Sequence, residues 1–291
     1  MSITSTLNDY ANGTITRADM ITALTSGDYT TGSVWHPFHE FRHIAPDSYD
    51  ELALAYFMHR LNDKDLHELK DAGLPITSEI ITAWSHARTM YDRVAAAYRG
   101  MFPGAQHNRR AQIVSGGPAS GKTTAIEENM PGAAESCVVL DPEYITGTLL
   151  RYYLATDTLD ARLPQAVKDF QDQGNTVFPM EVSFVAAEDS AKLAAIMLRT
   201  LAAEGVDLVI ETTMVPAAVG QQILDVLADN GYEVSIVEQH ATKEEALERA
   251  EKRFKKDYDE AIEILKNGQL TLGPKPVVPD YFEYVYTYQG E

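Results

Sequence analysis

One eight-residue segment constrains the fold of this chain more than any other. Residues 116–123 read Gly-Gly-Pro-Ala-Ser-Gly-Lys-Thr, which matches the pattern G-x-x-x-x-G-K-[ST] without a departure. In this pattern the glycines let the loop turn its backbone N–H groups inward around phosphates. Lys122 adds a positive charge, and the Thr123 hydroxyl is placed to bind Mg²⁺. The helix predicted to open at Gly121 directs its N-terminal dipole at the same anion, so the segment predicts a P-loop nucleotide site.

The residues on either side of this loop favour the same interpretation. A β-type run, Ile113-Val114, precedes the loop, and a helix predicted to end near Asn129 follows it. A turn without function is disfavoured because strand and helix stand in the required order. No Asn-Lys-x-Asp guanine-reading motif follows, so we expect ATP rather than GTP. The nucleotide-binding residues expected from the loop are Gly116, Gly117, Pro118, Ala119, Ser120, Gly121, Lys122, Thr123 and Thr124.

After residue 110 the chain alternates between short apolar runs and helical stretches. The runs rich in valine and isoleucine are Gln112–Ser115, Cys137–Leu140, Asp207–Glu211 and Glu233–Glu238. The clearest helical stretches between them are Ala186–Ala203 and Val215–Ala228. This alternation predicts an α/β fold, a P-loop kinase core with a parallel sheet flanked by helices. Ligands of such sheets bind outside the carboxyl ends of the strands, where the candidate site residues fall.

The residues before this core predict helices. Ser48-x-x-Glu51 is a capping-box signal, a helix from Asp65 to Asp71 stops at Gly73, and a longer helix opens at Thr77 or Ser78. We therefore expect a helical N-terminal region over residues 1–105 and a P-loop kinase domain over residues 106–291. The N-terminal region could cover an acceptor pocket, inhibit the kinase domain or bind a partner protein.

Composition narrows the class of partner and the compartment. The formal net charge of −19 repels nucleic-acid backbones and anionic lipids, so we expect neither nucleic acid nor membrane as a partner. No apolar run has the length needed to span a bilayer, and the start of the chain has no signal-peptide pattern. The single cysteine, Cys137, excludes an internal disulfide and reads as a small buried hydrophobe. A cytoplasmic location is the resulting expectation.

Residues 108–285 resemble the zeta-toxin branch of P-loop kinases. In that family the second strand ends in a pattern like Ile-Asp-x-Asp, whose second acid is the base that takes the proton of the substrate hydroxyl. The matching stretch here is Leu140-Asp141-Pro142-Glu143, in which Glu143 takes the place of the second aspartate. Register favours Glu143 as the catalytic base, whereas the aspartate chemistry favours Asp141. The alternative is that one of the two only caps the following helix.

The third predicted strand ends in Glu211-Thr212-Thr213, which looks like the Glu-Gly-Thr segment of the family with Thr212 replacing the glycine. The resemblance implies substrate contacts from Glu211 and Thr212. The alternative is an exposed glutamate followed by a helix-capping threonine.

Two arginines follow a second capping box, Thr242-x-x-Glu245, on one face of the helix it opens. The resemblance implies that Arg249 holds the nucleotide and that Arg253, with Lys122, stabilises the phosphoryl group in transfer. A surface pair between Arg249 and Glu245 is the rival interpretation. A later arginine of the family is matched only loosely, by Lys275.

The resemblance implies a cytoplasmic kinase that uses ATP and Mg²⁺ to phosphorylate a hydroxyl of a nucleotide-like metabolite. UDP-N-acetylglucosamine is the acceptor that it indicates. Alternatives are a kinase of NAD or of an antibiotic, and a non-catalytic ATP-binding module that regulates a protein partner. Some family members depend on a helical antitoxin, so an antitoxin or regulatory protein is a possible partner.

Two aromatic segments have weaker interpretations. The histidine-rich run of residues 36–43 suggests a metal cluster, but we favour local packing or substrate contact because Pro37 interrupts a regular helix and no cysteine is present there. The tail from Tyr281 to Tyr288 alternates in a strand-like way and predicts a packing edge strand.

Overall fold

The computed structural model describes residues 2–32, 36–130 and 132–288. The chain forms two compact units, and one segment of seven residues joins the second unit out of sequence order. The first unit comprises Met1–Trp35 and His43–Ala96, and the second comprises His36–Arg42 and Ala97–Glu291. The division of function at residues 105 and 106 stays a prediction.

The first unit is helical, as the sequence predicts. Its helices are α1 (Ile3–Ala11), α2 (Arg17–Thr25), α3 (Tyr49–Phe57), α4 (Asp63–Asp71) and the greater part of α5 (Ser78–Arg99). The Ser48 hydroxyl caps α3 by accepting the Glu51 amide at 3.1 Å, whereas the Glu51 carboxylate accepts from the amide of Asp47. The predicted box therefore forms with its second half displaced by one residue.

A four-stranded parallel sheet forms the centre of the second unit. The strands are β1 (Arg110–Gly116), β2 (Val138–Leu140), β3 (Leu208–Thr212) and β4 (Glu233–Gln239), in the order β2-β3-β1-β4. Register places Ile113 of β1 beside Ile210 of β3 and Ile236 of β4. All four predicted strands are confirmed, and their shared direction brings their carboxyl ends to one edge of the sheet.

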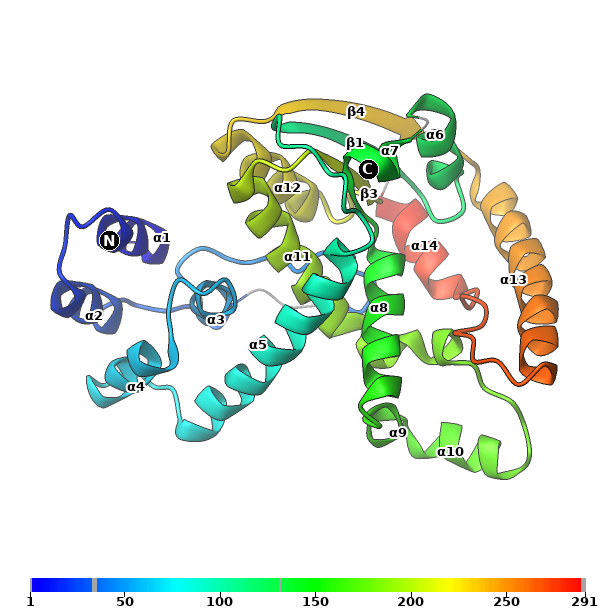
Figure 1. Cartoon of the computed structure of the whole chain (residues 1–291), viewed down its shortest axis with the longest axis horizontal. Coiled ribbons are helices and arrows are strands. Elements are labelled where there is room, and N and C mark those ends of the chain that lie inside the picture. Colours follow the sequence, from blue (N-terminus) through cyan, green and yellow to red (C-terminus); the bar gives the residue numbers. More distant parts are fainter. Residues whose placement is uncertain (1, 33–35, 131, 289–291) are drawn as a thin grey trace. The chain divides into compact units, whose positions relative to one another are not determined.

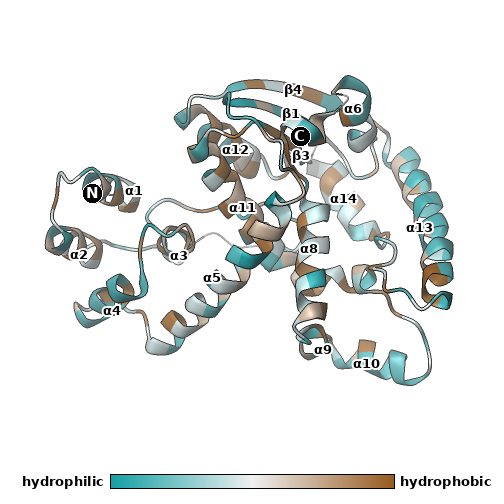
Figure 2. Cartoon of the chain, in the orientation of Figure 1, coloured by the Kyte–Doolittle hydropathy of each residue, from teal (hydrophilic) through white to brown (hydrophobic). Residues whose placement is uncertain are grey.

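Helices flank this sheet (Figure 1). They are α6 (Lys122–Asn129), α7 (Ala133–Ser136), α8 (Pro142–Ala155), α9 (Leu159–Arg162), α10 (Gln165–Asp172), the 3₁₀ segment η1 (Pro179–Ala186), α11 (Ala187–Glu204), α12 (Ala217–Asp229), α13 (Lys243–Lys266) and α14 (Pro279–Tyr288). Figure 2 shows that α13 is largely hydrophilic, and its buried residues are Ala246, Ala250 and Ala261. Helix α13 therefore packs through a narrow alanine face and leaves its charged residues at the surface.

The prediction of an edge strand at the aromatic tail is wrong, because these residues form α14. Phe282 and Val285 are both buried, at 4% and 0% exposure, and their spacing of three residues is that of a helix face. Phe282 packs in a cluster with Ala246 and Ala250 of α13. The sequence pattern of residues 281–288 was compatible with a strand, and burial against α13 therefore decided that the segment is a helix.

Two smaller expectations concern the whole chain. Cys137 is buried at 8% exposure, as expected, and burial raises the pKa of its thiol. Within the part of the chain that the structure describes, no helix combines the length and the apolar character needed to cross a membrane.

Candidate functional site

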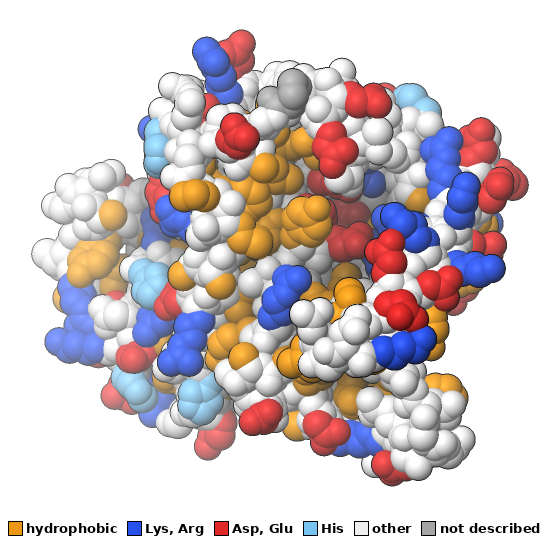
Figure 3. All heavy atoms as spheres, turned by 45° about the vertical axis from the view of Figure 1, so that its right-hand side comes forward, with side chains coloured by type: hydrophobic (Ala, Val, Ile, Leu, Met, Phe, Trp, Pro, Cys, Tyr) orange, Lys and Arg blue, Asp and Glu red, His pale blue; other side chains and the backbone are white. Residues whose placement is uncertain are grey.

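The carboxyl ends of β1, β2 and β3 open into one cavity of about 580 Å³ within the second unit. Its walls come from the loop before α6, the start of α8, η1 and α11, α13, the residues around Lys275, and the segment 37–40. Figure 3 turns the face with α13 forward and shows a hollow with acidic side chains in its depth and basic and hydrophobic side chains around it. This is the place at which parallel α/β sheets bind ligands.

The loop between β1 and α6 has the backbone of a P-loop. Three of its residues have positive φ angles: Gly116 (150°), Ala119 (54°) and Gly121 (100°). Glycine adopts such angles without strain, and it occupies two of these three positions. A Cβ atom at Gly117 would lie 2.7 Å from the ring and hydroxyl of Tyr286 in α14. The glycine at this position is therefore required by close packing as well as by the loop.

Lys122 and Thr123 open α6 and meet Glu211 from the end of β3. The Lys122 ammonium donates to the carbonyls of Gly116 and Gly117 at 3.0 and 2.9 Å, and it lies 3.9 Å from the Glu211 carboxylate. The Thr123 hydroxyl donates to Glu211 at 3.2 Å. Burial raises the pKa of Glu211, although Lys122 opposes this shift. Glu211 is only 14% exposed, so it does not match the alternative of an exposed surface glutamate.

Asp141 both caps α8 and lines the cavity. Its carboxylate accepts the Glu143 amide at 2.7 Å, and its own amide donates to the Tyr98 hydroxyl at 3.1 Å. Burial, followed by the negative charges of Glu211 and Glu143, raises the pKa of Asp141 to about 7. A carboxyl with this pKa exchanges protons near neutral pH, which suits a group that takes a proton.

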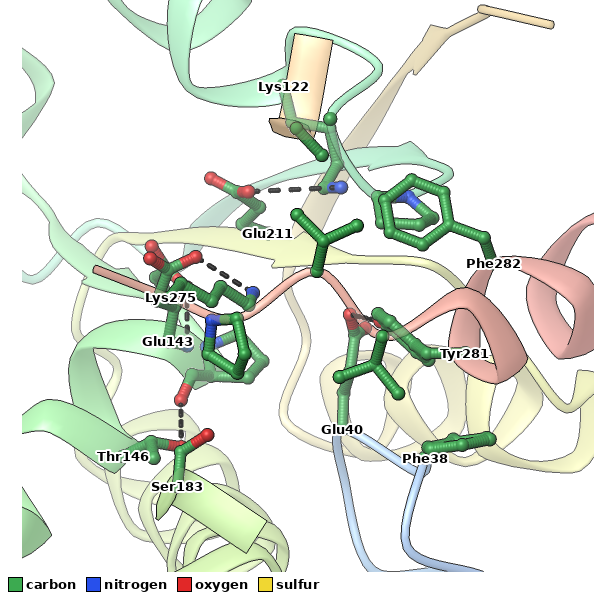
Figure 4. Close-up of a pocket in the computed structure, with 18 of the residues that line it drawn as sticks. Phe38, Glu40, Lys122, Glu143, Thr146, Ser183, Glu211, Lys275, Tyr281 and Phe282 are labelled. Carbon is green, nitrogen blue, oxygen red and sulfur yellow. Dashed lines mark hydrogen bonds and ion pairs between the residues drawn. The ribbon is translucent and has the colours of Figure 1, made fainter. Parts of the chain in front are cut away.

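Glu143 is held by Lys275 (Figure 4), whose ammonium donates to its carboxylate at 2.8 Å. The two side chains are 32% and 36% exposed. Burial would raise the pKa of Glu143, but the charge and hydrogen bond of Lys275 outweigh it, and the pKa of Glu143 is lowered. Glu143 is therefore ionised at neutral pH, in contrast to Asp141.

Positive charge reaches the cavity from α13. The capping box predicted at Thr242 and Glu245 is present, and it begins the helix that carries Arg249 and Arg253 to the cavity wall. Among the described residues neither guanidinium forms an ion pair within 4.0 Å, so the rival pairing of Arg249 with Glu245 is not made. Both positive charges remain available to an anion in the cavity.

Most of the residues that the sequence predicts for the site meet in this one cavity. Those that line it are Pro118, Ala119, Ser120, Gly121, Lys122, Thr123, Thr124, Asp141, Glu143, Glu211, Arg249 and Arg253. Gly116 ends β1 and Gly117 begins the loop, and neither is among the residues that line the cavity. Thr212 is buried at 1% exposure, and its hydroxyl donates to Glu40 at 3.1 Å. The structure thus places Thr212 beside the site, where it orders a neighbour, and does not place it on the cavity surface.

The sequence predicts local packing or substrate contact for residues 36–43, and part of this run also lines the cavity. Pro37, Phe38, His39 and Glu40 line it, as does Tyr281 of α14. The histidine-rich run packs on α14: the ring of His36 stacks on Tyr284 at 4.6 Å, and His39 Nε2 lies 2.8 Å from the Tyr284 hydroxyl. The only sequence signal for this segment was its unusual aromatic and histidine content, which did not indicate what it contacts.

Much of the chain is similar to known proteins. The model of the zeta toxin family matches residues 102–287, which is more than half of the chain. No curated protein matches the chain. A structure described as the PezAT chromosomal toxin–antitoxin system of Streptococcus pneumoniae is 15% identical, with a TM-score of 0.42 over 67% of this chain and 70% of that one.

A second structure, the complex AvrRxo1-ORF1:AvrRxo1-ORF2 with sulphate ions, is also 15% identical. Its TM-score is 0.40 over 56% of this chain and 48% of that one. The match of the family model, over a segment that contains the P-loop, the sheet and both cavity arginines, shows that the chain belongs to the zeta toxin family of P-loop kinase-like toxins.

Proposed function

We propose that this protein is an ATP-dependent phosphotransferase that phosphorylates a hydroxyl group of a nucleotide-like metabolite. The observation that carries the proposal is one cavity lined by the P-loop lysine, by Arg249 and Arg253, and by the carboxylates of Asp141, Glu143 and Glu211. Phosphoryl transfer to an alcohol needs cations around the phosphates and a proton acceptor beside the hydroxyl. The cavity supplies both within about 580 Å³.

On the donor side, the P-loop amides and Lys122 bind the phosphates of ATP. The Lys122 ammonium exchanges its bonds to the carbonyls of Gly116 and Gly117 for bonds to phosphate oxygens. Arg249 and Arg253 approach from α13 and neutralise charge on the transferred phosphoryl group. On an otherwise acidic chain, this local concentration of cations is what makes anion binding favourable.

The hard oxygen donors of Thr123 and Glu211, 3.2 Å apart beside the P-loop, fit Mg²⁺. When bound, the ion would offset negative charge on the phosphates. The residues expected to hold it are therefore Thr123, as the sequence predicts, and Glu211.

On the acceptor side, the hydroxyl oxygen attacks the terminal phosphorus of ATP, the bond to ADP breaks, and the hydroxyl proton passes to a carboxylate. Asp141 accepts the Glu143 amide at 2.7 Å, and the negative charges of Glu211 and Glu143 help to raise the pKa of Asp141, so the acceptor hydroxyl meets these carboxylates together. Lys275 keeps Glu143 ionised, whereas Asp141 has a pKa of about 7. UDP-N-acetylglucosamine is the first acceptor to test, and NAD is the second.

Mass spectrometry of a defined metabolite panel, incubated with the protein, ATP and Mg²⁺, tests this proposal. We expect one panel member to gain one phosphate, and Lys122→Ala to abolish the product while the circular dichroism spectrum stays unchanged. Lys256→Ala is the matched control, since Lys256 lies 72% exposed on α13 and outside the cavity. Full activity of Lys122→Ala would refute the assignment.

Tight ATP binding without any product would instead favour a regulatory ATP-binding module. Growth arrest on expression, relieved by Lys122→Ala, would link transfer to toxicity. Co-expression with a candidate antitoxin would then test the proposed protein partner.

A further inference from the structure

A short segment of the chain leaves the first unit and becomes part of the second. Residues 36–42 belong to the second unit, although the residues on both sides of them belong to the first. Phe41 is fully buried, the Arg42 amide donates to the Ala191 carbonyl at 2.9 Å, and the Gln222 side chain donates to the Arg42 carbonyl at 3.1 Å. These contacts fix the end of the segment to α11 and α12.

Glu40 ties the same segment to the end of β3 and the start of α14. One carboxylate oxygen accepts from the Thr213 amide at 2.6 Å and from the hydroxyls of Thr212 and Thr213 at 3.1 Å each. The other oxygen accepts from the Tyr281 hydroxyl at 2.9 Å. Hydrogen bonds to an ionised carboxylate are stronger than those between neutral groups. Four donors on one side chain therefore make Glu40 the main attachment of residues 37–40.

The position of this segment in the cavity indicates what it contacts. In Figure 4 Lys122 lies toward the top of the cavity, Glu143 at the left, and Glu40 and Phe38 toward the bottom. Phosphates bind at the Lys122 end, and the hydroxyl that receives the phosphoryl group must lie near the carboxylates. The remainder of the acceptor molecule must then extend toward Phe38 and Glu40, because all of these residues line one cavity.

We propose that residues 37–40 form the acceptor-side wall of the transfer site and that Glu40 positions this wall. The proposal rests on the proposed function and adds to it the part of the chain that selects the acceptor. The family match begins only at residue 102, so this wall is supplied by residues outside the region shared with the family. Phe38 and Phe184 place aromatic rings in the cavity lining, where Phe184 is 54% exposed, and Ser183 adds a hydroxyl. These groups suit an acceptor that carries a planar ring and several hydroxyls.

Kinetics of the full-length protein test the wall. UDP-N-acetylglucosamine, NAD and uridine serve as acceptor probes with radiolabelled ATP. For Glu40→Ala and Phe38→Ala we expect the KM of the acceptor to rise at least tenfold while the KM of ATP changes less than twofold. Glu40→Gln keeps one accepting oxygen and should fall between Glu40→Ala and the wild type.

Two matched controls lie outside the cavity lining. Glu233→Gln alters a glutamate at the amino end of β4, 85% exposed, and Phe170→Ala removes an aromatic ring of α10, 48% exposed. Both should keep the wild-type KM values for acceptor and ATP. A general loss of stability would not produce the split between the two KM values, and Phe38→Ala leaves the hydrogen bonds of Glu40 in place.

The outcomes separate this inference from the proposed function. Transfer with an unchanged acceptor KM in both Phe38→Ala and Glu40→Ala overturns the wall and leaves the kinase assignment intact. If the wild type binds ATP but phosphorylates no probe, the proposed function fails. In that case, calorimetry measures how tightly the same probes bind to protein loaded with a non-hydrolysable ATP analogue, and this binding tests whether residues 37–40 form the acceptor-side wall. Probe binding weakened at least tenfold by Phe38→Ala supports it, whereas equal binding, or no binding of any probe, overturns it.

Discussion

Replacing Asp141 by asparagine should stabilise the second unit at pH 8 and leave it almost unchanged at pH 4. The Asp141 side chain is buried, with 6% exposure, and burial together with the charges of Glu211 and Glu143 raises its pKa from 3.8 to about 7. Asparagine has nearly the same size and is about as good a helix N-cap as aspartate. Its amide oxygen can still accept the Glu143 amide that Asp141 accepts at 2.7 Å. Asp141→Asn therefore removes a buried charge and keeps the cap of α8.

The magnitude and sign follow from the two pKa values. A carboxyl whose pKa is raised on folding supports the fold fully below its unfolded pKa of 3.8, and that support is lost as the pH rises through about 7. One pKa unit corresponds to roughly 1 kcal/mol, so the wild type loses up to about 4 kcal/mol at pH 8 and less than about 1 kcal/mol at pH 4. The variant has no group that titrates at this position. Its gain in free energy of unfolding should therefore grow from below about 1 kcal/mol at pH 4 to about 4 kcal/mol at pH 8.

Hydrogen exchange measured by mass spectrometry on peptides from α8 and the sheet is the suitable assay. Trp84 belongs to the first unit, so its fluorescence would report on the wrong unit. Asp225→Asn is the matched control, because Asp225 is exposed on α12 and bonded to Gln221, and it should show no comparable gain at pH 8. A gain that is equal at pH 4 and pH 8, or a loss at pH 8, would show that the charge of Asp141 does not oppose folding.

Three further perturbations probe the site. Lys275→Met removes the cation that keeps the pKa of Glu143 low, so activity should fall more at pH 6 than at pH 8. Adding Glu143→Gln to this variant should restore the thermal stability that Lys275→Met loses. An equal loss of activity at both pH values would contradict the pairing of Lys275 with Glu143. Gly117→Ala places a Cβ 2.7 Å from the Tyr286 ring, so the affinity for a fluorescent ATP analogue should drop at least about tenfold. The affinity should recover when Tyr286→Ala is added, and no recovery would argue against the clash. Arg253→Ala should lower kcat by about a hundredfold or more with a smaller effect on ATP binding. Weaker ATP binding with an unchanged kcat would instead assign Arg253 to ground-state binding only.

The donor half of the site was predictable because its signals are local. The pattern from Gly116 to Thr123 specifies a loop between a strand and a helix, and both elements form where the sequence places them. Asp141 and Glu211 follow apolar runs that form β2 and β3, and the parallel arrangement of these strands brings the two acids together without further information. Predictions of this kind need only the residues within one element and its neighbour.

The part of the cavity proposed to bind the acceptor was not predictable, because it depends on pairs of residues far apart in the chain. Glu40 bonds Tyr281 across 241 positions, and Lys275 bonds Glu143 across 132. Neither contact has a periodic pattern or a spacing rule that would reveal it in one sequence. The conformation of α14 also depends on residues far away in the sequence. Its alternating aromatic residues are compatible with a strand, and packing against α13 selects the helix.

The sequence by itself therefore determined the phosphate loop, the parallel sheet and the acids at the ends of its strands, since hydrophobic periodicity and backbone geometry act over a few residues. Only the tertiary structure decided that Lys275 pairs with Glu143, that Tyr286 of α14 packs on Gly117 of the P-loop, and that residues 37–40 line the cavity. Long-range packing makes those choices, because burial and electrostatic energy depend on which surfaces meet in the folded chain.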